Sequence, residues 1–371
     1  MTGKLAIMQL GLGGVGQALV RQYFELAGRY PQLTYAGLGD RSGLLYREGG
    51  LSPADLDRAL RLKAGGGSIA QLAETPGNSA RLLAPSDSSL PDLSETVAQN
   101  AQTGSVVVVD ATGDRHTYAT LLTARTLGAH VVMSNKWPLS EPYARHEALL
   151  AAGAPASRIG FETTVGAALP VISTLQKLLQ TGDDVRRIEA AVSGTLGYVL
   201  SRLDEGTPFS SAVREAHRLG YTEPDPRDDL SGVDAQRKAL ILARVIGRRM
   251  DMEDVKVESL VPDPLRDADL DEFWPRLPDF DGEFAARVDS AASRGCVLRY
   301  VATVDDGGAS AGLAEVPANS QLGSLRGTDN LFVFHTRRYA ELPLSIRGPG
   351  AGAEVTASGV LSDILSLQDV R

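Results

Sequence analysis

The sequence predicts an α/β fold in which a doubly wound parallel sheet is followed by a second domain of mixed α+β structure. Near the start, a short apolar strand runs directly into a glycine turn and a helix. Strands then alternate with helices through about the first 150 residues, which is typical of a parallel sheet covered on both faces. The pattern changes after that point, and a length of 371 residues suits two domains.

The first unit of this pattern is β-α-β. An apolar strand at 5–10 is followed by Gly11, Gly13 and Gly16, then by a helix with one apolar face, then by a strand at 33–38. Glycines at this spacing between a strand and a helix are typical of a turn that binds the pyrophosphate of a dinucleotide. A plain helix-capping turn is the alternative, and it is disfavoured because three glycines lower local stability unless a ligand needs the space. We therefore expect a Rossmann-type domain.

Later segments extend this domain. The Val-rich run 105–110 predicts a strand buried on both faces, a helix over 117–127 ends at Gly128, and a strand over 130–133 leads into Ser134. The stretch 42–93 carries many Gly, Ser and Pro residues and is predicted to form irregular loops and short helices.

The second domain is predicted to begin with a helix over 169–179 and a strand over 188–193. Its later strands, at 298–304, 331–335 and 342–346, predict a separate and partly antiparallel sheet. A second glycine turn at 348–352 precedes an apolar helix over 355–367, so we expect the chain to return there to the nucleotide domain. The predicted domains are 1–158 plus 341–371 for the dinucleotide, and 159–340 for substrate binding, catalysis and dimerisation.

Composition excludes several classes of function. A net charge of -9 and a pI near 5.2 argue against a nucleic-acid surface. No apolar run approaches the roughly 20 residues that cross a bilayer, and the start lacks the features of a secretory leader, so we expect a cytoplasmic protein without membrane contact. The single cysteine, Cys296, excludes an intramolecular disulfide, and the five histidines lack metal-ligand spacing.

Two features of the sequence bear on cofactor and substrate. Asp40, about 24 residues beyond Gly16, stands near the position of an acid that meets the ribose hydroxyls, whereas Arg41 could pair with a 2′-phosphate. Asp40 and Arg41 are therefore compatible with binding of NAD, with binding of NADP, or with a simple surface ion pair. Further along, the acidic segment 220–229 precedes Ser231, which is a predicted N-cap. Asp234 and Lys238 then form an i, i+4 pair. Taken alone, these features predict a capped helix with a surface salt bridge.

Four stretches together resemble the homoserine dehydrogenase family: 134–138, 162–170, 193–198 and 219–226, the last followed by Asp234 and Lys238. The resemblance runs from the first glycine turn to the end of the chain. It implies reversible NAD(P)H-dependent hydride transfer between L-aspartate 4-semialdehyde and L-homoserine, in threonine, methionine and isoleucine biosynthesis. It also implies a homodimer, and no regulatory ACT domain is expected after the last helix.

The resemblance further implies roles for particular residues. Lys238 transfers a proton to or from the substrate oxygen, and Lys136 lies beside the nicotinamide and the reacting carbonyl. Homoserine is bound by Glu223 and Asp234, with Asp229 as a supporting carboxylate. A monovalent cation, usually sodium, is held largely by backbone oxygens of Glu162, Val165, Ala167 and Leu169. The predicted cofactor residues are Gly11, Gly13, Gly14, Val15, Gly16, Asp40, Arg41, Ala111, Thr112, Ser134, Lys136, Gly220 and Gly352.

Two other functions compete with this interpretation. A catalytically silent NAD(P)-binding regulator is one alternative, but it leaves Lys136 and Lys238 without a role. An aspartate-semialdehyde dehydrogenase acts through a cysteine thioester, and the neighbours of Cys296 predict a strand entry rather than a helix N-terminus that would activate a thiolate.

Overall fold

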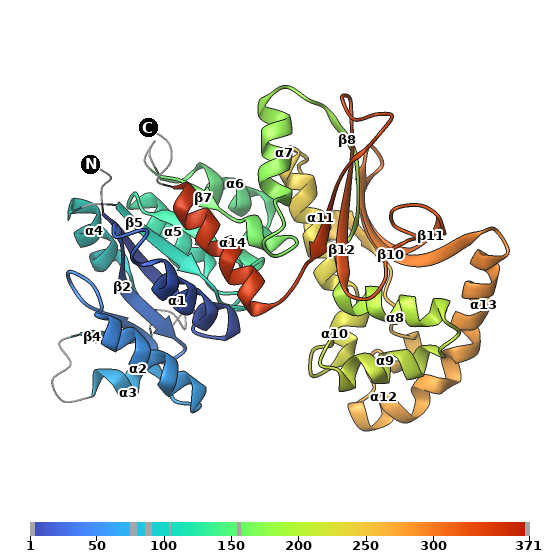
Figure 1. Cartoon of the computed structure of the whole chain (residues 1–371), viewed down its shortest axis with the longest axis horizontal. Helices are drawn as coiled ribbons and strands as arrows, with labels where there is room; N and C mark the ends of the chain where they lie inside the picture. Colours follow the sequence, from blue (N-terminus) through green and yellow to red (C-terminus); the bar gives the residue numbers. More distant parts are fainter. Residues whose placement is uncertain (1–3, 75–79, 86–90, 104, 154–156, 368–371) are drawn as a thin grey trace. The chain divides into compact units, whose positions relative to one another are not determined.

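The computed structural model describes residues 4–74, 80–85, 91–103, 105–153 and 157–367. The chain divides into two compact units (Figure 1). The first contains Met1–Ala168 and Gly352–Arg371, and the second contains Leu169–Ala351. The predicted α/β class, with a second sheet, is confirmed. No helix among the described residues combines the length and apolarity needed to cross a membrane.

The first unit is built on a seven-stranded sheet in the order β4-β3-β2-β1-β5-β6-β7. Its strands are β1 (Leu5–Leu10), β2 (Leu33–Asp40), β3 (Gly43–Tyr46), β4 (Arg81–Leu83), β5 (Ser105–Asp110), β6 (His130–Met133) and β7 (Ile159–Gly160). β3 and β4 are antiparallel additions at one edge, and the other strands run parallel. β1 and β5 are almost wholly buried, as expected for strands with a helix layer on each face.

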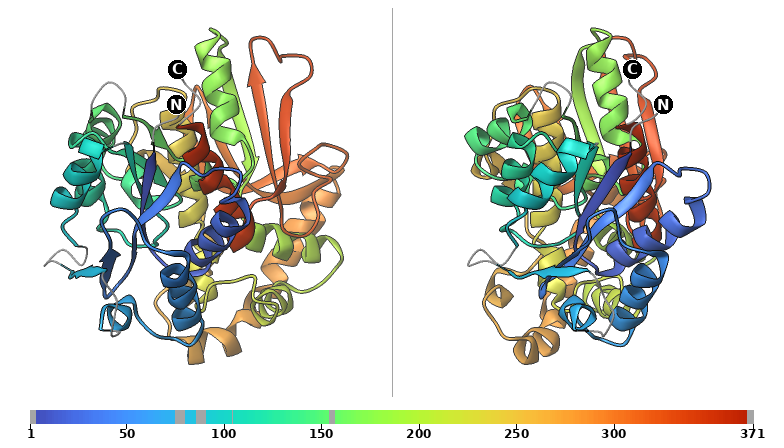
Figure 2. Two further views of the ribbon diagram at one scale, coloured as in Figure 1. Left: turned by 60° about the vertical axis from the view of Figure 1, so that its left-hand side comes forward. Right: turned by 90° about the vertical axis from the view of Figure 1, so that its left-hand side faces the viewer.

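Helices cover this sheet in two groups. α1 (Gly14–Leu26) and α14 (Ala353–Ser366) lie side by side, although they come from opposite ends of the sequence (Figures 1 and 2). α4 (Ser94–Thr103) packs on β5, and α5 (Tyr118–Thr126) packs on β6. The remaining helices are α2 (Pro53–Ala64), α3 (Ile69–Ala73) and α6 (Tyr143–Ala151). Burial of the apolar faces of α1 and α14 completes one core with the sheet.

The strand order indicates where a ligand crevice lies in the first unit. The chain proceeds from β1 outward to β2 on one side, and later from β5 outward to β6 on the other. In open α/β sheets a ligand binds at such a reversal, beyond the carboxyl ends of the strands. Here the reversal lies between β1 and β5, directly where the first glycine turn begins.

The second unit contains a six-stranded sheet in the order β13-β12-β8-β10-β11-β9. Its strands are β8 (Val185–Ala191), β9 (Val255–Val257), β10 (Cys296–Asp305), β11 (Gly308–Pro317), β12 (Asp329–Thr336) and β13 (Leu344–Pro349). All pairings are antiparallel except that of β9 with β11. The long β10–β11 hairpin was not predicted as a pair, because small and polar residues in β11 obscure its alternation.

The helices of the second unit are α7 (Val171–Gln180), α8 (Gly194–Asp204), α9 (Phe209–Arg218), α10 (Pro226–Leu230), α11 (Val233–Val245), α12 (Leu270–Arg276) and α13 (Asp281–Ala292). α8 packs on β10 and β12, and α11 packs on β9, β10 and β11. α11 is buried along most of its length. It therefore provides a rigid support for side chains that project from it.

Some predictions need correction. The predicted domain junctions at 159 and 341 are both too early, because β7 joins the first sheet and β13 pairs with β12 in the second. The stretch 42–93 is more regular than predicted, since it holds β3, β4 and the 12-residue helix α2. Ser231 is not the N-cap of the following helix: it ends α10, and Gly232, with φ 72°, caps α11.

Candidate functional site

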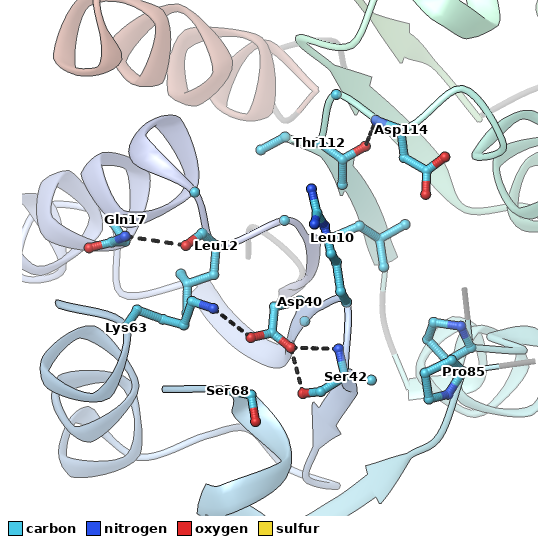
Figure 3. A pocket seen from close by; sticks show the side chains of 18 of the residues that line it. Leu10, Leu12, Gln17, Asp40, Ser42, Lys63, Ser68, Pro85, Thr112 and Asp114 are labelled. Atoms are coloured by element: carbon cyan, nitrogen blue, oxygen red, sulfur yellow. Dashed lines mark hydrogen bonds and ion pairs between the residues drawn. The ribbon is translucent and has the colours of Figure 1, made fainter. Parts of the chain in front are cut away.

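A pocket of about 1300 Å³ opens in the first unit at the carboxyl ends of β1, β2 and β5 (Figure 3). Its lining combines the first glycine turn, the ends of those strands and the loop before α3. The lining residues are Leu10, Gly11, Leu12, Gly13, Gln17, Gly39, Asp40, Arg41, Ser42, Gly43, Lys63, Gly66, Gly67, Ser68, Pro85, Pro91, Ala111, Thr112, Gly113, Asp114, Arg115 and His116. The pocket thus lies at the predicted switch point of the sheet.

The glycines of the turn are needed for different physical reasons. Gly11 has φ 97°, and a Cβ there would lie 2.6 Å from the Ala111 carbonyl oxygen. A Cβ at Gly16 would lie 2.1 Å from the Gly11 carbonyl oxygen, so Gly16 permits the close approach of α1 to the turn. Around Gly13 a Cβ would meet no atom within 4 Å, so this side of the turn is open toward the pocket. This combination suits a backbone that receives a pyrophosphate at a helix N-terminus.

Gln9 supports the turn from beneath, and the sequence prediction missed it. Its Nε2 donates to the Gly11 carbonyl at 2.8 Å and to the Gly16 carbonyl at 3.1 Å, and its Oε1 accepts from the Tyr35 hydroxyl at 2.7 Å. Gln9 is fully buried. One polar residue in an otherwise apolar strand was the available signal, since a buried amide must find partners.

The carboxylate of Asp40 is occupied by groups of the protein (Figure 3). It accepts from Lys63 Nζ at 2.8 Å, from the Ser42 amide and hydroxyl at 2.8 and 2.6 Å, and from the Ile69 amide at 3.1 Å. Burial opposes ionisation, but these hydrogen bonds outweigh it and lower the pKa of Asp40. Asp40 therefore ties the end of β2 to α2 and α3.

Lys136 stands at the end of a second short loop, after β6. It caps a 3₁₀ turn at Trp137–Leu139, and its carbonyl accepts from the Ser140 amide at 3.1 Å. The amide of Ser134 donates to the Asp110 carbonyl at 3.0 Å, which joins the ends of β5 and β6. Lys136 is thus presented by a fixed turn at the same edge of the sheet as the pocket.

In the second unit, Lys238 projects from α11. Its Nζ donates to the Val192 carbonyl at 2.7 Å and lies 2.8 Å from Asp234 Oδ2. Lys238 is 9% exposed whereas the side chain of Asp234 is 47% exposed, so the lysine end of the i, i+4 pair is buried and only its acidic end lies at the surface that the spacing alone predicts. A mostly buried ammonium held by one carbonyl and one carboxylate is expensive for a purely structural purpose.

Asp229 organises the segment that carries Glu223. Its carboxylate accepts from the Glu223 amide at 2.8 Å. The Thr195 hydroxyl, which has one proton to donate, lies 2.9 Å from the Asp229 carboxylate and also contacts the Tyr221 carbonyl. Burial raises the pKa of Asp229, these hydrogen bonds oppose the rise, and the charge of Asp234 adds to it. Thr195 was missed as a site residue, although it lies in a stretch noted for its resemblance.

The structure shows where the remaining predicted residues lie. Gly14 and Val15 begin α1 beside the pocket lining, and Gly352 is the N-cap of α14 in the same unit. Gly220 follows α9 in the second unit with φ 73°. The pocket therefore brings together Gly11, Gly13, Asp40, Arg41, Ala111 and Thr112, whereas Gly14, Val15, Gly16, Ser134, Lys136, Gly220 and Gly352 are not part of its lining.

The predicted cation ligands lie on a tight turn. Glu162 begins a 3₁₀ turn at Glu162–Thr164, and the Val165 amide donates to its carbonyl at 3.3 Å. Ala167, with φ 53°, is the one non-glycine residue with positive φ in the described part of the chain. The Leu169 carbonyl accepts from the Val171 amide at 2.7 Å. Within the described ranges no group of three or more His, Cys, Asp and Glu residues could hold a metal ion.

Relatives of known sequence are similar to this chain. A family model described as homoserine dehydrogenase matches residues 170–365. The homoserine dehydrogenase of Emericella nidulans is 36% identical over 381 residues, covering 99% of both chains. The chloroplastic bifunctional aspartokinase/homoserine dehydrogenase of Daucus carota is 45% identical over 268 residues, covering 71% of this chain and 29% of that protein. The chain thus spans about three tenths of the length of the chloroplastic bifunctional relatives that it matches.

Solved structures are similar over nearly the whole chain. A Candida auris protein of unknown function has a TM-score of 0.84 and 32% identity, and the match covers 98% of both chains. A hyperthermophilic archaeal homoserine dehydrogenase in complex with NADPH has a TM-score of 0.73 and 26% identity, and covers 98% of this chain and 97% of that one.

Proposed function

The chain belongs to the homoserine dehydrogenase family, and we propose that it catalyses NADP-dependent interconversion of L-homoserine and L-aspartate 4-semialdehyde. In this proposal the first unit binds the dinucleotide and the second binds the substrate. Among the chain's own residues, the observation that carries the proposal is Lys238, a mostly buried ammonium beside Asp234. A catalytically silent regulator would have no use for this costly arrangement.

The pocket favours NADP over NAD. Asp40 stands where an acid would bind the ribose hydroxyls, but Lys63, Ser42 and Ile69 already occupy its carboxylate. Arg41 and Lys63 also line the pocket, and their positive charges suit a 2′-phosphate. The NADPH complex of the archaeal homoserine dehydrogenase supports this preference.

The proposed mechanism assigns proton transfer to Lys238. A nicotinamide held by the first unit would supply or accept the hydride at the carbon that bears the substrate oxygen. In aldehyde reduction, the Lys238 ammonium donates a proton to the oxygen as negative charge develops there. In homoserine oxidation, the neutral amine takes that proton back. The Val192 carbonyl and Asp234 hold the nitrogen in place in the free protein. Lys136 is proposed to stabilise the same oxygen.

Carboxylates recognise the substrate's α-ammonium group. Glu223 is presented by a backbone that Asp229 holds through the Glu223 amide. Asp234 lies one helical turn before Lys238 on α11. Opposite charges attract, and both acids are accessible to a ligand in the free protein, since Glu223 is exposed and the side chain of Asp234 is 47% exposed.

Three further features belong to this proposal. A monovalent cation such as sodium would be held by backbone oxygens of Glu162, Val165, Ala167 and Leu169, and the unfavourable φ of Ala167 supports a backbone shaped for a ligand.

A homodimer is supported by the edge strand β13 and by Leu342, which is 77% exposed just before it. Light scattering tests the dimer, and cell fractionation tests a cytoplasmic location.

A spectrophotometric assay tests the activity. The purified chain is mixed with homoserine and NADP or NAD, and absorbance is followed at the reduced-nicotinamide band. We expect homoserine-dependent reduction, faster with NADP at low cofactor concentration. No absorbance change with either cofactor would refute the proposed activity and favour the silent regulator.

A further inference from the structure

A buried cluster beneath the pocket joins the two loops that follow β5 and β6. Asp110 is the last residue of β5 and is completely buried. Its Oδ1 accepts from the Thr112 amide at 3.0 Å and the Thr112 hydroxyl at 2.7 Å, and its Oδ2 accepts from Asn135 Nδ2 at 3.0 Å. One carboxylate therefore holds a loop of the pocket wall with one oxygen and the loop of Lys136 with the other.

Asn135 completes the connection from the other side. Its Nδ2 also lies 2.7 Å from the Asp114 carbonyl and 3.1 Å from the Thr117 hydroxyl, and its Oδ1 accepts from the Trp137 amide at 3.1 Å. Asn135 is 3% exposed. The amide thus fixes the backbone on both sides of Lys136 to the loop after β5.

The cluster has a cost that stability alone does not explain. A buried carboxylate loses its hydration, and burial raises the pKa of Asp110 although the hydrogen bonds of Thr112, Thr117 and Asn135 oppose the rise. Two loops at a sheet edge could be joined by apolar packing instead. A charge-assisted network fixes direction as well as distance, which a site for hydride transfer requires.

We infer that Asp110 and Asn135 are positioning residues that hold Lys136 at a fixed place relative to the pocket wall formed by Thr112 and Asp114. This inference rests on the proposed function for its kinetic consequence, but the mechanical link itself does not. Neither side chain lines the pocket, so both act through the loops that they join.

The test uses an isosteric change, Asn135→Asp. The introduced carboxylate keeps the acceptor for the Trp137 amide but replaces the donor to Asp110 by a second acid. We expect turnover with homoserine to fall about a hundredfold, as for a displacement of roughly 1 Å, while the NADPH dissociation constant rises by less than about tenfold. The loss should be larger near pH 9 than near pH 6, because a shared proton restores a donor at low pH and two ionised carboxylates repel at high pH.

Two further variants make the result specific. The double variant Asp110→Asn with Asn135→Asp restores one amide facing one acid, so we expect it to regain about tenfold of the lost turnover and to lose the new pH dependence. Thr96→Val removes another buried hydrogen bond of the same unit, from the Thr96 hydroxyl to the Leu93 carbonyl at 3.0 Å, and should leave turnover unchanged. Thermal unfolding of each variant shows that it is folded.

Hydrogen exchange separates this inference from the proposed function. In Asn135→Asp, amides of 111–116 and 134–140 should lose protection together, whether or not the wild-type chain oxidises homoserine. An inactive wild-type chain with coupled loosening would overturn the function and keep the link. Wild-type turnover in Asn135→Asp, loosening confined to 134–140, or a double variant no better than the single one would overturn the inference.

Discussion

Replacing Lys63 by methionine should change which cofactor the protein prefers. Lys63 Nζ lies 2.8 Å from Asp40, and the two side chains are 23% and 9% exposed, so the contact is partly shielded from water. Methionine keeps most of the apolar stem but removes the charge. In the proposed complex, NADP then loses one charge-assisted contact to its 2′-phosphate, worth about 1.5–3 kcal/mol, or about a ten- to hundredfold fall in kcat/KM.

The same change should leave kcat/KM with NAD unchanged or raise it. Without Lys63, the Asp40 carboxylate keeps its bonds to Ser42 and Ile69 but gains room for a ribose hydroxyl. Arg61→Met is the matched control, because Arg61 lies on the same helix and pairs only at the surface with Asp57. The assay is kcat/KM for both cofactors at saturating homoserine. Equal losses with NADP and NAD, or an unchanged ratio, would refute the assignment of Lys63 to the 2′-phosphate.

Three further predictions concern substrate binding, stability and pH. Glu223→Gln should raise the KM for homoserine more than it lowers kcat, since it weakens ammonium binding; an unchanged KM contradicts the role. Arg299→Met should lower the free energy of unfolding by about 3–5 kcal/mol, because buried Arg299 pairs with Asp204 at 2.8 Å. The control is Arg294→Met, which breaks an exposed pair with Glu315 and should lower it by less than about 1 kcal/mol. Urea denaturation measures both values. Burial raises the pKa of Asp363 from 3.8 to about 7. Between pH 3.8 and pH 7 the folded state therefore binds one more proton than the unfolded state, and the free energy of unfolding falls as the pH rises through this range. Asp363→Asn should remove this fall and stabilise the protein above pH 7 by up to about 4 kcal/mol, which thermal melts across pH would detect.

Local patterns predicted the frame of the first unit. The run 5–10, the glycine turn and the Val-rich run 105–110 carry their structure in adjacent residues, and the strands and helix formed where expected. The antiparallel strands β3 and β4 were missed because each is short and lies among turn-forming residues. The domain junctions were displaced because strand pairing across the sequence, which composition does not reveal, decides where each unit ends.

The site was predicted less completely than the fold. Residues within a motif, such as Gly11 and Lys238, could be named from sequence. Lys63 could not, since it reaches Asp40 from a helix 23 residues away. Nor could spacing reveal that Asp40 is occupied by protein donors, because that depends on how the loop before α3 returns to β2. Side chains that act by joining loops, such as Asn135, become visible only through their partners.

Proton transfer by Lys238 is tested most directly by single-turnover hydride transfer in Lys238→Ala, with Lys256→Ala on an exposed strand position of the same unit as control. With saturating homoserine and NADP, we expect the absorbance transient of Lys238→Ala to slow by about 10²–10⁴-fold, as for loss of a general acid–base group, while Lys256→Ala matches the wild type. A transient of normal rate in folded Lys238→Ala would contradict proton transfer by Lys238.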